Sequence, residues 1–306
     1  MRVILNPMAR HGAGRGLRPL IERELDRRGL QVDIVETEGP GHAAELARAA
    51  ADSGVRRVIA AGGDGTVHEV VNGLMAAAGS PPALGVIPVG TGNDFVKMAP
   101  GCATRAEAFA TLANGCTAPM DVGVARWDGR SEHFMNAMGT GVDVEVVRRM
   151  RRSGWLPGPM IYLTALLRAL ARYSPLPVRI VVDGEESTGR IMLLAVCNGP
   201  SIGGAFRICP DARPDDGMLD ACLVRELPLH RILRVVARVL RGTHAGRPGV
   251  SMHRGRHVVI SVHGGGALPF QLDGELREAT GSIEVSLAER RLNIICSVPA
   301  VPGPNE

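Results

Sequence analysis

Two glycine-rich segments carry the residues best suited to chemistry in this 306-residue chain. The first is Gly62-Gly63-Asp64-Gly65-Thr66-Val67-His68, which follows the apolar run at residues 58–61. Glycines let backbone N–H groups approach a polyphosphate closely, and a helix N-terminus adds donors and a partial positive charge. The Asp64 carboxylate would repel a bare phosphate, but it can hold a metal ion or a water molecule. The segment therefore predicts a site for a metal-bound nucleotide.

The start of the following helix is predicted from a local motif. Thr66 and Glu69 have the spacing of a capping box, in which each side chain bonds the other residue's backbone N–H. Apolar residues then recur with a helical period. This pattern predicts a helix over residues 67–77 that begins after Thr66.

A second glycine loop follows the next apolar run. Residues 84–89 predict a buried strand, and Gly90-Thr91-Gly92-Asn93-Asp94-Phe95 comes directly after it. Two strands that each end in such a loop suit the carboxyl edge of a parallel sheet, where these sheets bind ligands. The alternative is that the glycines serve turn geometry alone, with Asp94 as a turn carboxylate or a brace for its own loop.

The composition limits the class of protein. Hydrophobic residues make up 45% and charged residues 22%, which is ordinary for a soluble globular protein, and the length allows two domains. A net charge of +4 is too mild to indicate nucleic acid, so no nucleic-acid partner is expected. No P-loop pattern ending in Gly-Lys-Ser/Thr occurs, which argues against a Walker-type ATPase.

The cysteines and the apolar runs bear on location. The 6 cysteines are scattered without a Cys-x-x-Cys pair, which favours buried free thiols in a reducing cytoplasm over disulfides or zinc. No stretch approaches the ~20 apolar residues of a membrane span, and the N-terminus does not resemble a signal peptide. We therefore expect a cytoplasmic protein whose membrane contact is peripheral.

Strands and helices alternate up to residue 121. Strands are predicted at residues 3–6, 31–36, 57–61 and 84–87, and helices at 17–28, 42–52, 67–77 and 105–114. Thr104 and Glu107 form a second predicted capping box, at the start of the last helix. Alternation of this kind predicts an α/β domain with a parallel sheet flanked by helices.

From residue 122 to 288 the pattern becomes β-rich. Strands are predicted at residues 120–126, 133–138, 178–182, 189–197, 219–224, 257–262 and 283–287, with Asp183-Gly184 as one of the turns. This half predicts a mostly antiparallel β-sandwich domain with inserted helices. Residues 289–306 are expected to return to the first domain.

Two basic segments in the second half leave alternatives open. Over residues 229–241 an apolar stripe lies opposite Arg231, Arg234, Arg238 and Arg241, which is typical of a solvated basic face and also of a membrane-surface helix. A second basic segment, residues 148–152, precedes Trp155 and a helix predicted over 159–172. It suits either core packing or an anionic bilayer surface.

The two glycine loops together resemble the catalytic domain of bacterial diacylglycerol kinases, which is shared with sphingosine and ceramide kinases. Further matches run along the chain in order: Asn6-Pro7, Thr37, Pro210-Asp211-Ala212, residues 215–220 and Leu272-Asp273-Gly274-Glu275. The first loop alone is also similar to NAD kinases and 6-phosphofructokinases. The second loop and the late Asp-Gly-Glu favour the lipid branch.

This resemblance implies an active site in a cleft between the domains and transfer of the ATP γ-phosphate to the hydroxyl of diacylglycerol or a related lipid. It implies Glu275 as general base, with Asp273 and Asp64 as further catalytic residues, and ATP and Mg²⁺ as cofactors. The residues expected to contact ATP are Asn6, Thr37, Gly62, Gly63, Asp64, Gly65, Thr66, Val67, His68, Thr91, Gly92, Asn93 and Asp94. A structural magnesium would be held by Asp216 and the carbonyls of Arg213 and Met218.

Some points stay open at this stage. Family members often carry a serine shortly after the first Asn-Pro, whereas this chain has Ala9, which removes a hydroxyl donor. Without the resemblance, Asp273-Gly274 indicates a plain hairpin turn. A small-molecule kinase similar to NAD kinases and a nucleotide-binding regulator without activity are the rival functions. The expected partners are a lipid substrate and an anionic membrane surface, and the sequence leaves a homodimer open.

Overall fold

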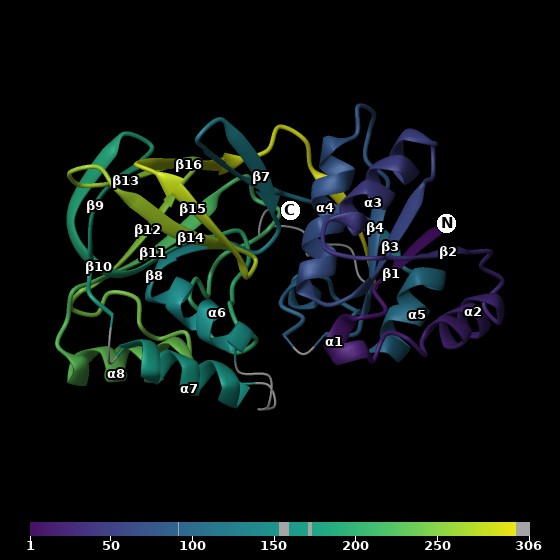
Figure 1. The fold of residues 1–306 in the computed structure, drawn as a ribbon, viewed down its shortest axis with the longest axis horizontal. Helices are drawn as coiled ribbons and strands as arrows, with labels where there is room; N and C mark the ends of the chain where they lie inside the picture. The colour runs from purple at the N-terminus through teal and green to yellow at the C-terminus, as the bar shows by residue number, and fades with distance from the viewer. Residues whose placement is uncertain (91, 153–158, 171–172, 298–306) are drawn as a thin grey trace, which may run out of the picture. The chain divides into compact units, whose positions relative to one another are not determined.

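The chain forms two compact units in the computed structural model, which describes residues 1–90, 92–152, 159–170 and 173–297 (Figure 1). Unit 1 comprises Met1–Asp121 together with Glu289–Glu306, and unit 2 comprises Val122–Ala288. Each unit has its own sheet and its own buried apolar core.

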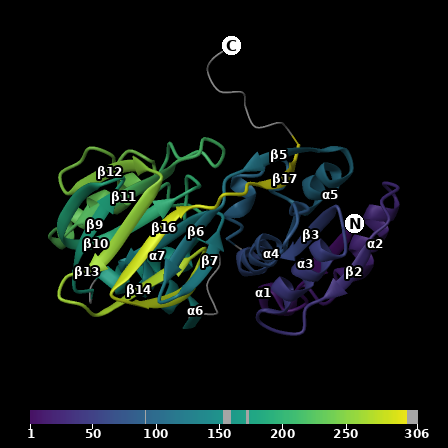
Figure 2. The ribbon, with the colours of Figure 1, turned by 90° about the horizontal axis from the view of Figure 1, so that it is seen from above.

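Unit 1 is built on a six-stranded sheet of order β2-β1-β3-β4-β17-β5. Its strands are β1 Arg2–Leu5, β2 Asp33–Glu36, β3 Arg57–Gly62, β4 Ala83–Pro88, β5 Cys116–Met120 and β17 Leu292–Cys296. The first four pair in parallel, β17 is parallel to β4, and β5 is antiparallel to β17. Figure 2 shows the yellow β17 beside β5. The last described strand of the chain therefore belongs to the same sheet as the N-terminal strands.

The helices of unit 1 cover both faces of this sheet. They are α1 Ala9–Gly12, α2 Arg18–Asp26, α3 His42–Asp52, α4 Asp64–Ala76 and α5 Arg105–Asn114, with a 3₁₀ turn η1 at Phe95–Lys97. One core cluster joins alternate strand residues such as Leu5 and Ile59 to α2 and α5. Ile4 and Ala60, which point to the other face, are also fully buried. Burial on both faces is the reason why these strands read as continuous apolar runs.

The two predicted capping boxes have different outcomes. At α5 both reciprocal hydrogen bonds between Thr104 and Glu107 are present, which confirms the prediction. At α4 the prediction is wrong, because the helix begins at Asp64 with Gly63 as its N-cap. Glu69 instead accepts hydrogen bonds from the backbone N–H groups of Gly41 (2.9 Å) and Ala43 (3.2 Å), at the start of α3.

Unit 2 contains an 11-stranded antiparallel sheet. Its strands are β6 Gly123–Trp127, β7 Arg130–Phe134, β8 Ala137–Gly141, β9 Leu176–Val182, β10 Glu185–Cys197, β11 Leu219–Arg225, β12 Val250–Gly255, β13 His257–Val262, β14 Ala267–Leu272, β15 Glu275–Thr280 and β16 Ser282–Leu287. They run in the order β15-β14-β8-β10-β9-β13-β16-β6-β7, and β11 pairs with β10 and β12. Residues from both ends of this order share one core, where Trp127 meets Phe270 edge-to-face at 5.0 Å. The sheet thus packs on itself like a sandwich, as predicted.

Two strand predictions need correction in detail, and three strands were missed. The predicted strand at 120–126 is two strands, β5 and β6, and that at 133–138 is divided between β7 and β8. The sequence analysis did not identify β12, β14 and β15 as strands. The interior Pro269 and the charged residues of β15 hide the alternation that marks the other strands.

Aspartate-glycine pairs form three of the hairpin turns of unit 2. At Asp128-Gly129, Asp183-Gly184 and Asp273-Gly274 both residues have positive φ, as a two-residue type I′ turn requires. In each pair the aspartate carboxylate also accepts a backbone N–H from another strand or loop; Asp183, for example, bonds Arg256 and His257. These aspartates therefore fix both the turn and the position of a neighbouring segment.

Three helices, α6 Val142–Arg152, α7 Pro159–Leu170 and α8 Leu229–Val239, pack with β10 and β11 in a second apolar cluster of unit 2. The predicted apolar stripe of α8 divides in the structure. Ile232, Val235 and Val239 are buried, whereas Leu229 and Leu233 are 52% and 41% exposed. Trp155 lies outside the described residues. Among the described helices, none has the length and apolar character to cross a bilayer.

All 6 cysteines are free thiols, as predicted, and all are buried except the partly exposed Cys116. Burial raises the pKa of the Cys102 thiol to about 11. The thiols of unit 2 are enclosed as well, and burial raises the pKa of Cys197 and Cys222. High thiol pKa values disfavour the reactive thiolate, so these side chains act as small apolar groups.

His244 is a fully buried titratable group of unit 2. Its Nε2 lies 2.9 Å from the Ile208 carbonyl oxygen, and its Nδ1 has no hydrogen-bond partner. A neutral ring that donates from Nε2 fits this arrangement. Burial lowers the pKa of His244 below its usual value, although the Ile208 carbonyl opposes the shift.

The lowered pKa predicts acid sensitivity. The unfolded chain binds a proton at His244 below about pH 6.5, whereas the folded chain resists it, so stability present at neutral pH is lost as the pH falls through that range. We expect the free energy of unfolding to fall by up to about 1.4 kcal/mol per pH unit from this residue alone. Urea unfolding of the parent and of His244→Gln between pH 7 and 5 measures it. His230→Gln, at the surface, is the control and should keep the parental pH dependence of the unfolding free energy. If His244→Gln also keeps it, the assignment to His244 is contradicted.

Candidate active site

Four predicted site segments of unit 1 lie at the carboxyl ends of neighbouring parallel strands. Asn6 follows β1, Thr37 follows β2, residues 62–64 end β3, and residues 89–94 follow β4. The backbone continues the ladder past the strand ends, because Asn6 N–H donates to Ala61 O and Thr37 N–H to Leu5 O, each at 2.9 Å. The parallel order β2-β1-β3-β4 therefore gathers these segments along one edge, as the sequence pattern predicted.

The two glycine loops approach each other backbone to backbone. A Cβ atom on Gly90 would lie 2.7 Å from the Cα of Gly63, and a Cβ on Gly92 would lie 2.8 Å from Asp64 Oδ2. Neither Gly63, Gly90 nor Gly92 has a positive φ. Their lack of a side chain, and not an unusual backbone conformation, is what this edge requires.

A hydrogen bond between side chains ties the first strand to α4. Asn6 Nδ2 donates to Thr66 Oγ1 at 3.0 Å, and Asn6 Oδ1 accepts the Met8 N–H at 2.9 Å. Gly14 closes the loop after β1, since a Cβ there would lie 2.2 Å from Asn6 O. The role of Gly14 is therefore close approach of the backbone. Ala9, the departure noted from the sequence, is buried in α1.

The residues at the start of α4 are not equally exposed. Asp64 and Gly65 are partly exposed, whereas Thr66, Val67 and His68 are buried at 5%, 4% and 3%. The backbone N–H groups of Thr66 and Val67 both donate to Gly63 O. The first turn of the helix, at Asp64 and Gly65, is thus the part that can meet a ligand. Thr91 lies outside the described residues.

The second loop holds its shape through its own side chains. Asn93 adopts a left-handed backbone conformation with φ of 47°, and its Nδ2 donates to Gly90 O at 3.0 Å. Asp94 pairs with the sole lysine of the chain, Lys97, at 2.7 Å. Asp94 thus has an ion-pair partner within the segment that follows the loop.

This edge has the chemistry of a nucleotide phosphate site. It combines the N-terminus of a 13-residue helix, two loops without side chains at their closest approach, and one carboxylate, Asp64. Helix N-termini and open backbone suit phosphate oxygens. A carboxylate beside them suits a divalent cation bound to those oxygens. The residues at this edge therefore fit ATP with Mg²⁺.

In unit 2, Glu275 lies at the first position of β15, directly after the Asp273-Gly274 turn. The Asp273 carboxylate accepts three backbone hydrogen bonds, from Met135 (2.8 Å), Asn136 (2.9 Å) and Ala137 (3.0 Å). Asp273 is thereby a structural anchor for the turn that presents Glu275. The partly exposed Glu275 side chain lies near the Arg277 guanidinium, whose pKa is raised mainly by its paired hydrogen bonds to Glu132.

A buried polar pair that the sequence analysis missed supports the same turn. Gln271 Nε2 donates to Asp143 Oδ2 at 2.8 Å, and Gln271 Oε1 accepts the Gly274 N–H at 2.5 Å. Both side chains are almost fully buried. A Cβ on Gly139 would overlap Asp143 Oδ2, so Gly139 leaves room for the pair. The distance of 128 residues between Asp143 and Gln271 explains why no local motif reveals it.

The predicted structural-magnesium segment is stabilised by an arginine. The Asp216 carboxylate accepts the Met218 N–H at 3.1 Å and forms an ion pair with Arg254, which also lies 4.0 Å from Asp220. Arg213 pairs with Asp215 at 3.3 Å. Within the described part of the chain, no group of three or more His, Cys, Asp or Glu side chains is placed to hold a metal.

The charges of this segment nevertheless fit a divalent cation. Asp220 Oδ2 is buried without a hydrogen-bond partner. Burial raises the pKa of Asp220, Arg254 lowers it, and the nearby carboxylates of Asp216 and Asp211 raise it further. The Arg254 guanidinium is therefore shared between the carboxylates of Asp216 and Asp220. The residues present would accept an ion held by Asp216 and by backbone carbonyls, in competition with Arg254.

Comparison with known proteins matches both units. Residues 1–125 match the diacylglycerol kinase catalytic domain, and residues 136–296 match the YegS C-terminal NAD kinase beta sandwich-like domain. The chain is 34% identical to a diacylglycerol kinase of Mycobacterium tuberculosis, over 92% of this chain and 93% of that protein. It is 31% identical to a diacylglycerol kinase of Bacillus subtilis, over 90% and 89%.

Solved structures show the same fold. A diacylglycerol kinase from Bacillus anthracis superposes with a TM-score of 0.72 at 23% identity, covering 98% of this chain and 97% of that one. An NAD kinase from Archaeoglobus fulgidus in complex with ATP gives 0.54 at 14% identity, covering 96% and 93%. The resemblance inferred from the glycine loops and the late Asp-Gly-Glu is thus confirmed, and the chain belongs to the diacylglycerol kinase-like family of lipid kinases.

Proposed function

We propose that this lipid kinase transfers the γ-phosphate of ATP to the hydroxyl group of diacylglycerol or a related lipid. The observation that carries the proposal is the close approach of two glycine loops beside the first turn of α4, where Asp64 of the first loop faces Gly92 of the second. Family membership supplies the acceptor class, because the relatives in Mycobacterium tuberculosis and Bacillus subtilis are named diacylglycerol kinases.

Unit 1 binds the nucleotide in this proposal. The backbone N–H groups at the start of α4 and in the loop after β4 face phosphate oxygens, and Asn6 holds the first strand to α4 through Thr66. Bound Mg²⁺ would neutralise charge on the transferred phosphoryl group, and Asp64 is the carboxylate placed to orient it. Thr37, at the end of β2, lies on the same sheet edge.

Glu275 accepts the proton of the attacking lipid hydroxyl in this proposal. Phosphoryl transfer needs little covalent chemistry from the protein, but the acceptor oxygen becomes a better nucleophile as it loses its proton. Three backbone hydrogen bonds to Asp273 and the Gln271–Gly274 hydrogen bond limit the movement of the turn beside Glu275. Asp273 thus acts by positioning the base.

We also propose that the kinase works at an anionic membrane surface, as a peripheral protein of the cytoplasm. Four of the large apolar side chains that stay exposed in the described residues lie on α7 or at α8: Leu167, Leu229, Leu233 and Leu240. Exposed arginines flank them, with Arg231 and Arg234 on α8 and Arg241 just beyond its end. Leucines that enter the acyl boundary and arginines that bind lipid phosphates suit such a surface.

A second candidate function is phosphorylation of a small or nucleotide acceptor. It is favoured by the shared fold with the ATP-bound NAD kinase structure. The sequence relatives named lipid kinases, including the probable lipid kinase YegS-like of Xanthomonas euvesicatoria at 31% identity, favour the lipid acceptor instead.

The assigned reaction predicts the behaviour of Glu275→Gln. Loss of the base should lower turnover by about 10²–10⁴-fold, while ATP binding is kept. The measurement is transfer of labelled phosphate from ATP to a panel of diacylglycerol, phosphatidylglycerol, a sphingoid base, NAD and nucleosides.

The same panel contains the outcomes that would contradict the proposal. If the label appeared in NAD or a nucleoside and not in an extractable lipid, the result would contradict the lipid acceptor and favour the second candidate function. Near-parental turnover by Glu275→Gln would show that Glu275 is not the general base. Glu278→Gln serves as the matched control, because Glu278 lies on the same strand and is exposed.

The Asp216 segment predicts a magnesium effect on stability that is independent of catalysis. Millimolar Mg²⁺ without ATP should raise the thermal midpoint of the parent, and Asp216→Asn should abolish the rise. Binding at a hundredfold excess over Kd corresponds to about 2.7 kcal/mol. Arg254→Met removes the competing guanidinium, so its response to Mg²⁺ should be larger. Equal shifts of the thermal midpoint in all three proteins would show that the ion does not bind at this segment.

The surface of α8 predicts charge-dependent binding to vesicles. The parent should sediment with vesicles of phosphatidylglycerol and phosphatidylcholine, and much less with phosphatidylcholine alone. Changing Leu229 and Leu233 to serine, or Arg231 and Arg234 to glutamine, should weaken binding, since each basic residue contributes about 1 kcal/mol near an anionic surface.

The control for that experiment changes exposed arginines of unit 1. Arg23→Gln and Arg27→Gln on or next to α2 alter the net charge equally but lie outside the proposed surface. Equal loss of binding from the control pair would indicate a general charge effect and would overturn the assignment to α8.

A further inference from the structure

Two thiols face each other across the last strand pair of the sheet in unit 1. Cys116 is the first residue of β5 and Cys296 is the last residue of β17, and the antiparallel register places them directly opposite each other. Their Sγ atoms are 3.9 Å apart. Residues opposed in this way have Cα atoms about 4.5–5.5 Å apart, which lies within the range that disulfides span. The two thiols can therefore be joined without rearrangement of the sheet.

The two thiols differ in their access to solvent. Cys116 is partly exposed and belongs to β5, the edge strand of the sheet order, whereas Cys296 is only 1% exposed. A small oxidant in solution therefore reaches the first thiol and not the second. An accessible thiol with a second thiol beside it is typical of cysteines that are oxidised reversibly.

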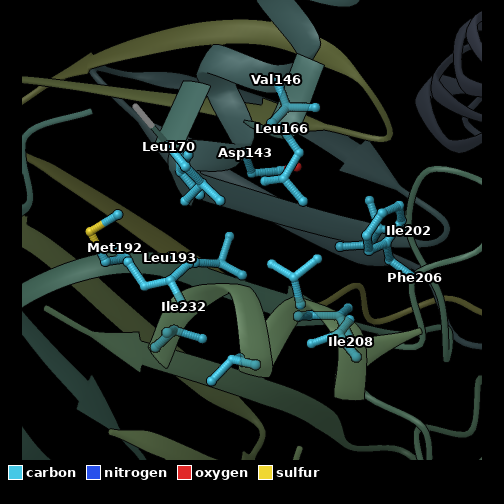
Figure 3. A pocket seen from close by; sticks show the side chains of 15 residues that line it. Asp143, Val146, Leu166, Leu170, Met192, Leu193, Ile202, Phe206, Ile208 and Ile232 are labelled. Atoms are coloured by element: carbon cyan, nitrogen blue, oxygen red, sulfur yellow. The ribbon is translucent and has the colours of Figure 1, made fainter. Parts of the chain in front are cut away.

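The thiols of unit 2 lack this access. Cys197, Cys209 and Cys222 belong to the apolar cluster of α6, α7 and α8, and Figure 3 shows other members of that cluster, such as Met192 and Ile208. Cys209 and Cys197 are hydrogen-bonded to each other, but all three thiols are at most 1% exposed. Burial also raises the pKa of each thiol, which disfavours the reactive thiolate. These residues provide an internal comparison, in which thiols lie close together but are closed to an oxidant.

We propose that Cys116 and Cys296 form a reversible disulfide when the protein meets hydrogen peroxide. The Cys116 sulfur attacks the peroxide, so that an S–O bond forms, the O–O bond breaks and one water molecule leaves. The Cys296 sulfur then attacks the sulfenic sulfur, so that the S–S bond forms, the S–O bond breaks and a second water molecule leaves. The two thiols lose two electrons and two protons, which the peroxide takes up. A small-molecule thiol restores the pair by exchange.

The disulfide would hold the returning strand in the sheet of unit 1. β17 lies between β4 and β5, and the two cysteines are 180 positions apart because all of unit 2 intervenes. A crosslink that closes so long a segment stabilises the folded chain by restricting the unfolded one. The end of β17 also supports the segment after the second glycine loop, because Ser297 N–H donates to Pro100 O at 2.8 Å. In a reducing compartment the bond is transient, so the stabilisation lasts only while the oxidant is present.

Peptide mapping is the first test. Trypsin leaves the three thiols of unit 1, Cys102, Cys116 and Cys296, in separate peptides, which are residues 98–105, 106–126 and 292–306. After treatment of the full-length protein with hydrogen peroxide, mass spectrometry should find the second and third peptides joined. A thiol reductant should separate them again. The absence of a joined peptide, or a joined peptide that contains Cys102, would overturn the proposal.

Variants at the two positions test the order of the steps. Cys296→Ala removes the second thiol, so peroxide should leave Cys116 as a sulfenic acid that dimedone labels. Cys116→Ser removes the accessible thiol, so Cys296 should stay unlabelled at the same peroxide dose. Cys102→Ser is the matched control, because Cys102 is a buried thiol whose pKa the nearby Cys296 helps to raise, and this variant should form the disulfide at the parental rate. Labelling of Cys296 in Cys116→Ser as fast as that of Cys116 in Cys296→Ala would contradict the assigned order.

Thermal unfolding tests the consequence for the fold. The oxidised parent should unfold about 5–10 °C above the reduced parent, as a disulfide that closes a long segment implies. Cys116→Ser and Cys296→Ala should show no such rise after peroxide treatment. Each protein is compared with its own reduced form, so a loss of stability from the substitution itself does not enter the comparison. A joined parent whose midpoint is unchanged or lower would refute the stabilising role of the bond, and an equal rise in the variants would assign the effect to another residue.

Discussion

The backbone loops at Gly63 and Gly90 approach each other closely. The arrangement at the carboxyl edge of the parallel sheet in unit 1 depends on this constraint. A methyl group on Gly90 would overlap the Cα of Gly63, and one on Gly92 would overlap the Asp64 carboxylate. Parallel pairing of β3 with β4, continued by the hydrogen bond from Val89 N–H to Gly62 O, brings the loops together. The two loops can pack in direct backbone contact beside the N-terminus of α4 only because neither carries a side chain at the point of contact.

In unit 2, aspartate-glycine turns hold separate segments of the backbone together. A two-residue hairpin of this kind leaves the aspartate carboxylate free to bond the backbone of a different segment, and Asp128, Asp183 and Asp273 all do so. At Asp273 three backbone N–H groups converge on one carboxylate. These three hydrogen bonds make Asp273 an anchor of its turn, and they limit the movement of the backbone that leads into Glu275.

The sequence predicted local features well and long-range ones poorly. The α5 capping box, the parallel strands and the turn at Asp183 follow from residues close together in the chain, and each is present. The same capping motif failed at Thr66, because Glu69 bonds the start of α3, which is 26 to 28 residues away. The Asp143–Gln271 pair and the Arg254–Asp216 pair likewise join distant segments, and no spacing rule reveals them.

The two faces of α8 differ in burial. Ile232, Val235 and Val239 are buried in the apolar cluster with β10 and β11, while Leu229 and Leu233 on the other side are exposed. In the proposed membrane-surface function, Leu229 and Leu233 would meet acyl chains. Binding to the membrane would then remove from water the apolar side chains that the free protein exposes.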